Sequence, residues 1–204
     1  MVGHIFKRDP NVEQFNFCLE KLYTEPRRPG ALLALETFYV GTFPGINRVY
    51  LYAVVDIFSS FAFGFLHTSK VPEGAVAILH NEVFPFYREK NISLGAVQTS
   101  NGREFCGQEM HLFELYLALN DVEHRYTRDE LPQSKIPMER FKRLVLNELF
   151  RTSFREENYE SVDVIQGELN MWLHHYNLQR PCLGYPNLGK TAFDLIDDYI
   201  QCRI

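Results

Sequence analysis

The sequence predicts an α/β domain built on a mixed five-stranded sheet with helices on its faces. Three apolar, strand-like runs with short connections come first, at residues 31–40, 48–58 and 61–67. Helical and strand-like segments alternate after them. Short connections favour antiparallel neighbours, whereas strands separated by helices favour parallel pairing. The first three strands are therefore expected to be antiparallel and the later ones parallel.

The individual elements follow from the period of the apolar residues and from the turn residues between them. The first strand is almost continuously apolar, as expected of a buried strand, and residues 41–47 (GTFPGIN) have the composition of a turn. Apolar residues at helical spacing predict helices over 73–90, 108–119, 136–151, 161–176 and 191–202. Two short runs, 94–99 and 122–126, predict the fourth and fifth strands. Pro137 fits the first turn of its helix, where a missing N–H costs little.

The chain divides into an N-terminal arm, residues 1–30, and one domain, residues 31–204. The arm is polar, contains one candidate helix around residues 12–23, and ends in the breaker sequence EPRRPG at 25–30. A chain of 204 residues suits a single ordinary-sized domain, which buries roughly 70% of the surface of its unfolded state.

The charge balance excludes a uniformly basic nucleic-acid-binding surface. Lys and Arg total 21 against 26 for Asp and Glu, which gives a net charge of −5. The segment 125–155 differs from the rest, because it holds eight basic and four acidic residues, a net +4 that leaves −9 elsewhere. Any contact with a phosphate backbone is therefore expected to use this local segment.

Cysteine usage and hydropathy predict a cytoplasmic protein with no membrane contact. The four cysteines form no CxxC pair and lack zinc-ligand spacing from the seven histidines, so free thiols in a reducing compartment are expected. Residues 1–10 lack the apolar core of a signal peptide. The longest apolar stretch, 49–65, is interrupted by Asp56 and two serines.

Five segments in order carry a family resemblance. They are LALETFY at 33–39, YAVVDIFSS at 52–60, VQTSNGREF at 97–105, PQS at 132–134 leading to ERF at 139–141, and YNLQRP at 176–181. Over about residues 32–196 the chain resembles the catalytic cores of retroviral-type integrases and bacterial insertion-sequence transposases, the DDE recombinases with an RNase H-like fold. The resemblance implies an RNase H-like fold for the mixed sheet and structural anchoring for Tyr176-Asn177 and Arg180-Pro181.

The resemblance also implies a metal-dependent site with two substituted positions. In this family three carboxylates hold two divalent ions, one activating the attacking oxygen and the other stabilising the leaving oxygen. The family pattern has Asp, Asp and Glu where this chain has Glu36, Ser100 and Glu139. Glu36 is one methylene longer and Ser100 is neutral, so Mg²⁺ or Mn²⁺ is expected to bind weakly at Glu36 and Glu139, or not at all. Three other acids are candidates to replace the missing carboxylate, namely Asp56, Glu104 and Asp129.

Each of these residues also has a structural interpretation. An unpaired buried carboxylate is costly, so Glu36 could have a Lys or Arg partner in the sheet. Residues 100–102 (SNG) are a common turn sequence, and Glu139 could pair with Arg143 one helical turn on. The basic segment is either a solvated helix face or a DNA-backbone track. The residues expected to contact DNA are Asn101, Arg128, Lys135, Arg140, Lys142 and Arg143.

Taken together, the resemblance implies a degenerate integrase-core protein that is catalytically impaired, a pseudoenzyme retained for DNA binding or assembly. It is expected to be a homodimer that meets DNA through residues 125–155. The arm is too short to hold a helix-turn-helix module that reads DNA ends. Two alternatives stay open. One is an active Mg²⁺- or Mn²⁺-dependent nuclease or recombinase with an atypical acidic site. The other is a protein-interaction module without a role at DNA, which the acidic net charge favours.

Overall fold

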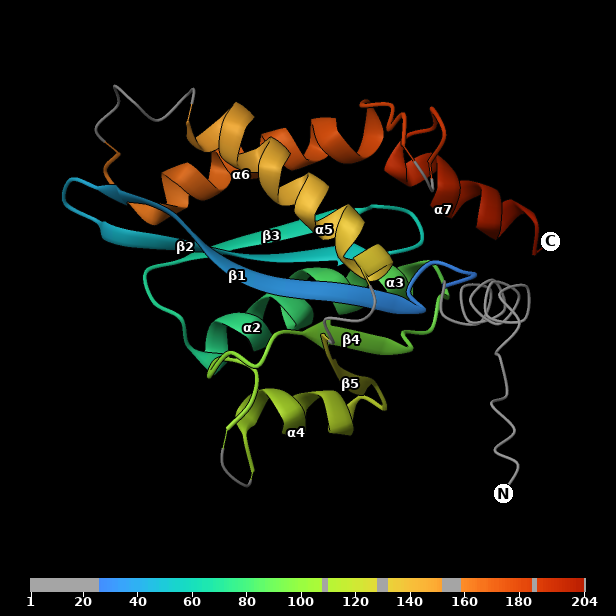
Figure 1. Cartoon of the computed structure of the whole chain (residues 1–204), viewed down its shortest axis with the longest axis horizontal. Coiled ribbons are helices and arrows are strands. Elements are labelled where there is room, and N and C mark those ends of the chain that lie inside the picture. Colours follow the sequence, from blue (N-terminus) through green and yellow to red (C-terminus); the bar gives the residue numbers. More distant parts are fainter. Residues whose placement is uncertain (1–25, 108–109, 128–131, 152–158, 185–186, 204) are drawn as a thin grey trace, which may run out of the picture.

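The structure, a computed structural model, describes residues 26–107, 110–127, 132–151, 159–184 and 187–203. It shows a central sheet between two layers of helices, with α5 and α6 over one face and α2, α3 and α4 over the other (Figure 1). The helix predicted around residues 12–23 lies outside the described residues. Within the described ranges, no helix is both long and apolar enough to cross a membrane.

The sheet has five strands in the order β3-β2-β1-β4-β5. Strands β1 (Leu32–Phe43), β2 (Asn47–Asp56) and β3 (Ala62–His67) pair antiparallel. Strand β4 (Ala96–Thr99) is parallel to β1, and β5 (Glu123–Tyr126) is parallel to β4. The predicted mixed sheet, with antiparallel strands followed by parallel ones, is therefore confirmed.

The helices lie where the apolar period predicted them, with differences at their ends. They are α2 (Pro72–Ile78), the π-helical segment η1 (Leu79–Val83), α3 (Phe84–Glu89), α4 (Leu112–Leu119), α5 (Pro132–Val145), the π-helical segment η2 (Leu146–Phe150), α6 (Val162–Leu178) and α7 (Ala192–Gln201). The predicted helix over 73–90 is thus three successive segments. The prediction for Pro137 was wrong: α5 begins at Pro132, so Pro137 lies inside the helix. Pro132 takes the first helical position, where its missing N–H costs least.

Strands β1 and β2 form a longer hairpin than the sequence predicted. Residues 41–43, which composition assigned to a turn, pair with residues 47–49. The turn shrinks to Pro44-Gly45-Ile46 and is closed by two residues with positive φ, Gly45 at 80° and Asn47 at 74°. Glycine and asparagine accept this conformation at low cost, which is why so short a connection suffices.

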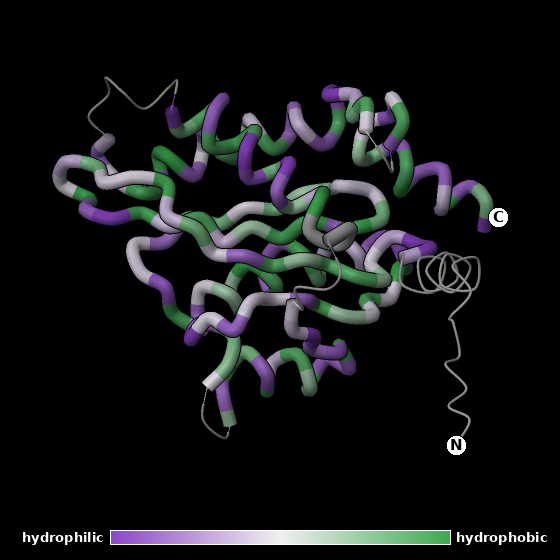
Figure 2. Tube along the Cα trace, viewed as in Figure 1, coloured by the Kyte–Doolittle hydropathy of each residue, from purple (hydrophilic) through white to green (hydrophobic). Residues whose placement is uncertain are grey.

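Alternate side chains of β1 enter two separate cores. Leu32, Ala34 and Phe38 pack with residues of α5 and α6, whereas Leu33 and Leu35 pack with residues of α2, α3 and α4. This is the two-residue period of a strand that is covered on both faces. Figure 2 shows the resulting concentration of apolar residues along the central strands.

Side-chain amides of α6 complete the outer edge of β3. Asn177 accepts a hydrogen bond from the Ala62 N–H at 2.9 Å and donates one to the Ala62 carbonyl at 2.8 Å. Gln166 likewise accepts from the Leu66 N–H at 2.8 Å and donates to the Gly64 carbonyl at 3.0 Å. These amides take the place of a sixth strand, which blocks edge-to-edge pairing. The structural anchoring implied for Tyr176-Asn177 is confirmed.

Asp56 joins three segments that are distant in the sequence. Its fully buried carboxylate accepts hydrogen bonds from the N–H groups of Gly30 and Phe58 and from the Tyr87 hydroxyl, at 2.8, 2.7 and 2.7 Å. Burial raises the pKa of Asp56, and the hydrogen bonds oppose that rise. The carboxyl group therefore holds the start of the domain and α3 against the turn between β2 and β3.

We expect Asn177→Leu to destabilise the domain by about 2–4 kcal/mol, because it leaves both backbone groups of Ala62 buried without partners. Urea unfolding followed by circular dichroism measures the change. His174→Leu, an exposed position on the same helix, is the matched control and should cost less than about 1 kcal/mol. If both variants lost the same free energy of unfolding, the hydrogen bonds to Ala62 would contribute no more to stability than an exposed side chain does.

We expect Asp56→Asn to remove part of the pH dependence of folding. Because burial raises the pKa of Asp56, the folded protein holds this proton more tightly than the unfolded chain does. The free energy of unfolding of the wild type, relative to that of the variant, should fall as pH rises from about 3.9 through the folded-state pKa. Urea unfolding at a series of pH values gives this difference. A difference that increased with pH would contradict the assignment.

Candidate functional site

Glu36 and Ser100 meet where β1 and β4 part. The last parallel pair between these strands is Leu35 with Thr99, so the next residue of each strand is Glu36 and Ser100. Glu36 is two residues from both Ala34 and Phe38 along β1. Its side chain therefore points to the same face of the sheet as theirs, the face that α5 covers. The register alone thus brings together the first two positions that the family resemblance singled out.

Lys142 of α5 neutralises Glu36. Its Nζ lies 3.6 Å from Glu36 Oε2 and 5.4 Å from the centroid of the Phe38 ring. Both charged side chains are about one-third exposed, at 33% and 31%. Such a partly solvated pair contributes roughly 0.2–1 kcal/mol to stability. A cationic partner for Glu36 was expected from the sheet, and the structure supplies it from a helix.

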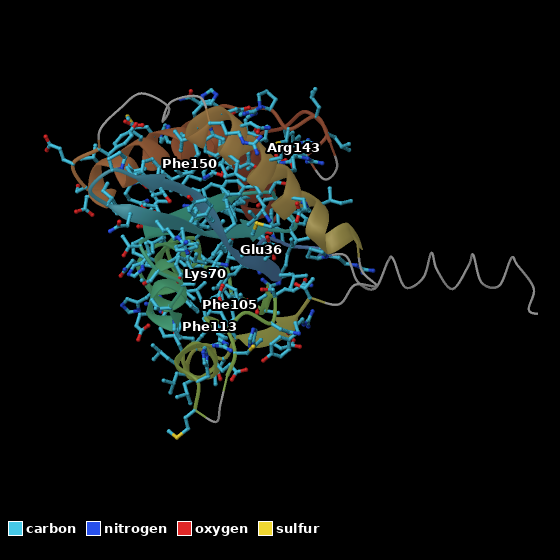
Figure 3. The ribbon with its side chains drawn as sticks, turned by 60° about the vertical axis from the view of Figure 1, so that its left-hand side comes forward. Glu36, Lys70, Phe105, Phe113, Arg143 and Phe150 are labelled. Carbon is cyan, nitrogen blue, oxygen red and sulfur yellow. The ribbon has the colours of Figure 1, made fainter. Side chains whose placement is uncertain are left out.

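A second lysine neutralises the neighbouring acid, Glu104. The Glu104 side chain is buried, and its Oε1 lies 3.8 Å from Lys70 Nζ. Lys70 Nζ also donates a hydrogen bond to the Thr37 carbonyl at 3.0 Å, one residue along β1 from Glu36. In Figure 3, Glu36 accordingly lies between Lys70 and the helix α5 that carries Arg143. Glu36 and Glu104 therefore both face ammonium groups.

A tight turn follows β4 at residues 102–106, just after the residues 100–102 whose composition suggested one. The N–H groups of Phe105 and Cys106 both donate to the Gly102 carbonyl, at 2.9 and 3.1 Å. A Cβ atom on Gly102 would lie only 2.6 Å from Glu104 Oε2, so a larger residue here would displace the Glu104 carboxylate. Ser100 and Asn101 are exposed between β4 and this turn. This segment thus presents a neutral hydroxyl and an amide where the family pattern has a carboxylate.

Glu139 lies on α5 one turn before Lys142 and is exposed. Its suggested ion pair with Arg143 is absent from the described part of the chain. Among the described residues, no set of three or more His, Cys, Asp or Glu side chains is arranged to hold a metal ion. A neutral Ser100 and two lysine-bound carboxylates do not fit a site for two divalent ions, which requires several free oxygen ligands.

Of the other two candidate acids, the structure describes Asp56, and it does not reach Glu36. Asp56 pairs with Leu33 in the sheet register, toward the opposite end of β1, and its oxygens are occupied by hydrogen bonds. Asp129 lies outside the described residues.

The basic side chains are divided among several environments. Arg143 is exposed on α5, next in sequence to Lys142, whereas the guanidinium of Arg140 packs close to Gly184. Arg125 pairs with Glu123 at 2.6 Å, and Arg151 donates to Asn147 at 2.9 Å. Arg128 and Arg155 lie outside the described residues, as does the side chain of Lys135. Of the residues expected to contact DNA, the structure therefore places Lys142 beside Glu36 and leaves Arg143 and Asn101 exposed, and the described residues of 125–155 do not form a continuous basic track.

Sequence reasoning missed a relay of polar side chains behind the turn. Thr99 Oγ1 lies 2.8 Å from His124 Nε2, and His124 Nδ1 lies 3.6 Å from Glu114 Oε1. Tyr126 donates to the same Glu114 oxygen at 2.6 Å. Burial lowers the pKa of His124, whereas the hydrogen bond to Glu114 and burial raise the pKa of Tyr126 to about 12.

These contacts connect the end of β4 to β5 and α4. They therefore hold Thr99, the residue before Ser100, in place. The only sequence signal for these contacts is the alternation of His124 and Tyr126 along one face of β5. Glu114 and Thr99 are joined to that face only when the parallel strands pair.

Comparisons with known proteins identify the fold and no more. No family model matches the sequence, and no curated protein matches it. A chain of the simian T-cell lymphotropic virus intasome in complex with PP2A regulatory subunit B56 gamma is similar with a TM-score of 0.64 and 14% identity. That match covers 84% of the present chain and 56% of the viral one, so the present chain spans only about half of the viral chain's length.

Two isolated viral cores match over nearly their whole length. The catalytic core domain of BIV integrase has a TM-score of 0.58 and 14% identity, covering 85% of this chain and 96% of the core. The HTLV-2 integrase catalytic core in complex with magnesium has a TM-score of 0.56 and 14% identity, covering 83% of this chain and 97% of the core. The chain therefore has the RNase H-like fold of retroviral integrase catalytic cores.

Proposed function

We propose that this protein is an integrase-fold pseudoenzyme, which binds DNA or contributes to an assembly without catalysing phosphodiester cleavage or strand transfer. The observation that carries this proposal is the ion pair between Lys142 and Glu36 beside the neutral Ser100. It occupies the position where the family resemblance places two acidic metal ligands.

The charges around the parting strands argue against a catalytic pair of divalent ions. Glu36 and Glu104 carry two negative charges, and Lys142 and Lys70 carry two positive ones. A divalent ion at Glu36 would meet an ammonium group at close range, and Ser100 offers no charge to compensate. Binding a metal there therefore requires Lys142 to leave.

The same lysine supports a contact with DNA. Lys142 and Arg143 are adjacent on α5, Arg143 is exposed, and Asn101 is exposed in the segment after β4. Cationic side chains of this kind bind phosphate groups without reading the base sequence. The HTLV-2 core has been solved in dimeric and trimeric forms. By analogy of fold, we propose that the present domain forms a homodimer.

We expect the wild type to show no saturable Mn²⁺ binding in calorimetry at millimolar metal. The triple variant Glu36→Asp, Ser100→Asp and Lys142→Ala restores the acidic pair and removes the cation. It should bind Mn²⁺ with a Kd on the order of 10⁻⁴–10⁻³ M, typical of a weak carboxylate site. Adding Glu139→Gln to the triple variant should weaken that binding about tenfold or more.

The competing nuclease or recombinase function makes the opposite prediction. Wild-type protein would then nick duplex DNA or transfer strands with Mg²⁺ or Mn²⁺, and Glu139→Gln would abolish the reaction. That result would overturn the proposal that the protein is a pseudoenzyme.

We expect duplex DNA to bind in a salt-dependent manner through Lys142 and Arg143. Lys142→Gln and Arg143→Gln should each weaken binding, and each should reduce the slope of log K against log salt by about one. Arg48→Gln, an exposed position on the β1–β2 hairpin, is the matched control and should change neither quantity. Fluorescence anisotropy at several salt concentrations measures both. Equal behaviour of all three variants would favour a protein-interaction module instead.

A further inference from the structure

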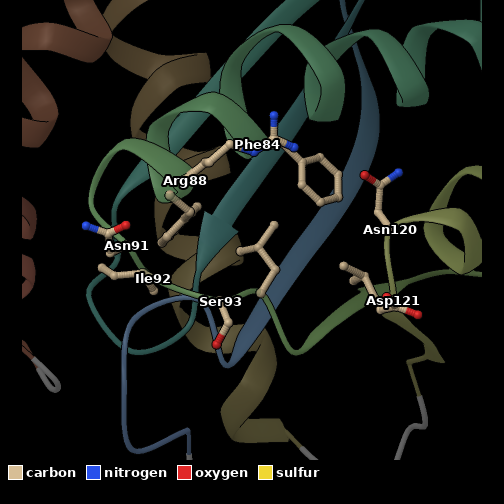
Figure 4. Close-up of a pocket in the computed structure, with 10 residues that line it drawn as sticks. Phe84, Arg88, Asn91, Ile92, Ser93, Asn120 and Asp121 are labelled. Atoms are coloured by element: carbon tan, nitrogen blue, oxygen red, sulfur yellow. The ribbon is translucent and has the colours of Figure 1, made fainter.

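The depression drawn in Figure 4 offers little surface to a ligand. It lies between the end of α3, the loop before β4 and the turn before β5. Tyr87, Ile92 and Val122, which line it, are already buried. An uncovered aromatic surface lies instead on the β1–β2 hairpin, which extends past α2 in Figure 1.

Side chains from three strands form a row of rings on the face of the sheet that α2 covers. Tyr39 of β1 pairs with Tyr50 of β2, and Tyr50 pairs with His67 of β3, so all three point to one face. The ring centroids of Tyr39 and Tyr50 lie 5.9 Å apart. The neighbouring row is covered, because the Tyr52 ring packs against Gly74 of α2. The row of Tyr39, Tyr50 and His67 lies one step further along the strands and is partly exposed.

Tyr39 is held in place although half of its surface is exposed. It is 50% exposed, and its hydroxyl lies 2.7 Å from Thr42 Oγ1. The register of β1 shifts between Tyr39 and Gly41, which leaves Val40 as the extra residue of a β-bulge. Bulges often re-aim the side chains beside them. An exposed ring that is already fixed in this way loses little freedom when it binds a ligand.

The charge presented beside these rings is positive. Lys70 Nζ lies 5.8 Å from the centroid of the Tyr50 ring, and the Lys70 side chain is 42% exposed. The side chain of its partner Glu104 is only 8% exposed, so the ammonium group rather than the carboxylate faces solvent. Exposed rings beside an ammonium group fit a single nucleic-acid strand, whose unpaired bases stack on aromatic side chains and whose phosphates attract the cation. The bases of a duplex are already stacked on one another, so a duplex does not fit this surface.

We propose that Tyr39 and Tyr50 bind single-stranded DNA by stacking on its bases, with Lys70 beside a phosphate group. The choice of DNA over RNA rests on the proposed function, the duplex contact through Lys142, whereas the stacking does not. The two surfaces are separate, because Lys142 lies on α5, which covers the opposite face of the sheet from these rings.

Fluorescence anisotropy with labelled oligothymidylate tests the stacking. Tyr39→Leu and Tyr50→Leu should each weaken binding about fivefold or more, the loss expected for one stacked base. Tyr39→Phe keeps the ring and removes only the hydroxyl, so this matched control should bind within about twofold of the wild type. Circular dichroism shows that each variant is folded, and Tyr39→Leu should bind duplex DNA as the wild type does.

Three results of the anisotropy measurements would contradict the proposal. Failure of the wild type to bind the single strand, or equal affinities of Tyr39→Leu and Tyr39→Phe, would overturn the stacking, whatever the duplex measurements give. Equal affinities would mean that the surface suits a partner that only covers apolar area, such as a protein. Oligouridylate bound about tenfold more tightly than oligothymidylate would overturn the choice of DNA.

The salt dependence of binding tests the role of Lys70. Lys70→Gln should reduce the slope of log K against log salt for oligothymidylate by about 0.7, the value for one phosphate contact with a single strand. An unchanged slope would overturn the contact between Lys70 and a phosphate.

Photochemical crosslinking locates the bound strand. An oligonucleotide that contains 5-iodouracil forms adducts with aromatic side chains close to the base, and mass spectrometry identifies the modified peptides. The adducts should fall on Tyr39 or Tyr50 and should be lost from position 39 in Tyr39→Leu. Adducts confined to α5 would overturn the proposal, because the single strand would then bind at Lys142.

Discussion

The candidate site depends on the short parallel pairing between β1 and β4. β1 has twelve residues, but β4 has four, and their shared register ends at Leu35 and Thr99. Beyond that point β1 keeps β2 as its neighbour, and its other side is open to α5 and to the turn after β4. Open α/β sheets place ligand sites where neighbouring strands part in this way. The positions of Glu36 and Ser100 follow from this constraint.

The chemistry of the site is decided by which cations reach that opening. Lys142 lies on α5, and Lys70 lies in the segment between β3 and α2. Each meets one carboxylate, so the opening is locally balanced in charge although the chain has a net charge of −5. The HTLV-2 core in complex with magnesium has the same fold, so the fold by itself does not decide whether a metal binds at this opening.

Buried polar groups elsewhere hold the elements that frame the opening. Asn177 and Gln166 satisfy the free edge of β3, and Asp56 joins Gly30, the β2–β3 turn and α3. The relay through His124 fixes the end of β4. Each of these groups is costly to bury without partners, so they favour one arrangement over its alternatives. The sheet edges and strand ends are thereby fixed more closely than apolar packing alone would fix them.

The period of the apolar residues determined the type and order of the elements, and with them the mixed sheet, because each amphipathic face needs only a local pattern. The sequence also placed Glu36 and Ser100 at the ends of neighbouring strands, because this follows from strand order, whereas the turn after β4 lies at 102–106 and not at 100–102. Tertiary structure alone decided that the partner of Glu36 is Lys142, that Glu104 binds Lys70, and that Pro137 lies inside α5. The two lysine contacts join residues far apart in the chain, so they form only when packing sets the distances between side chains.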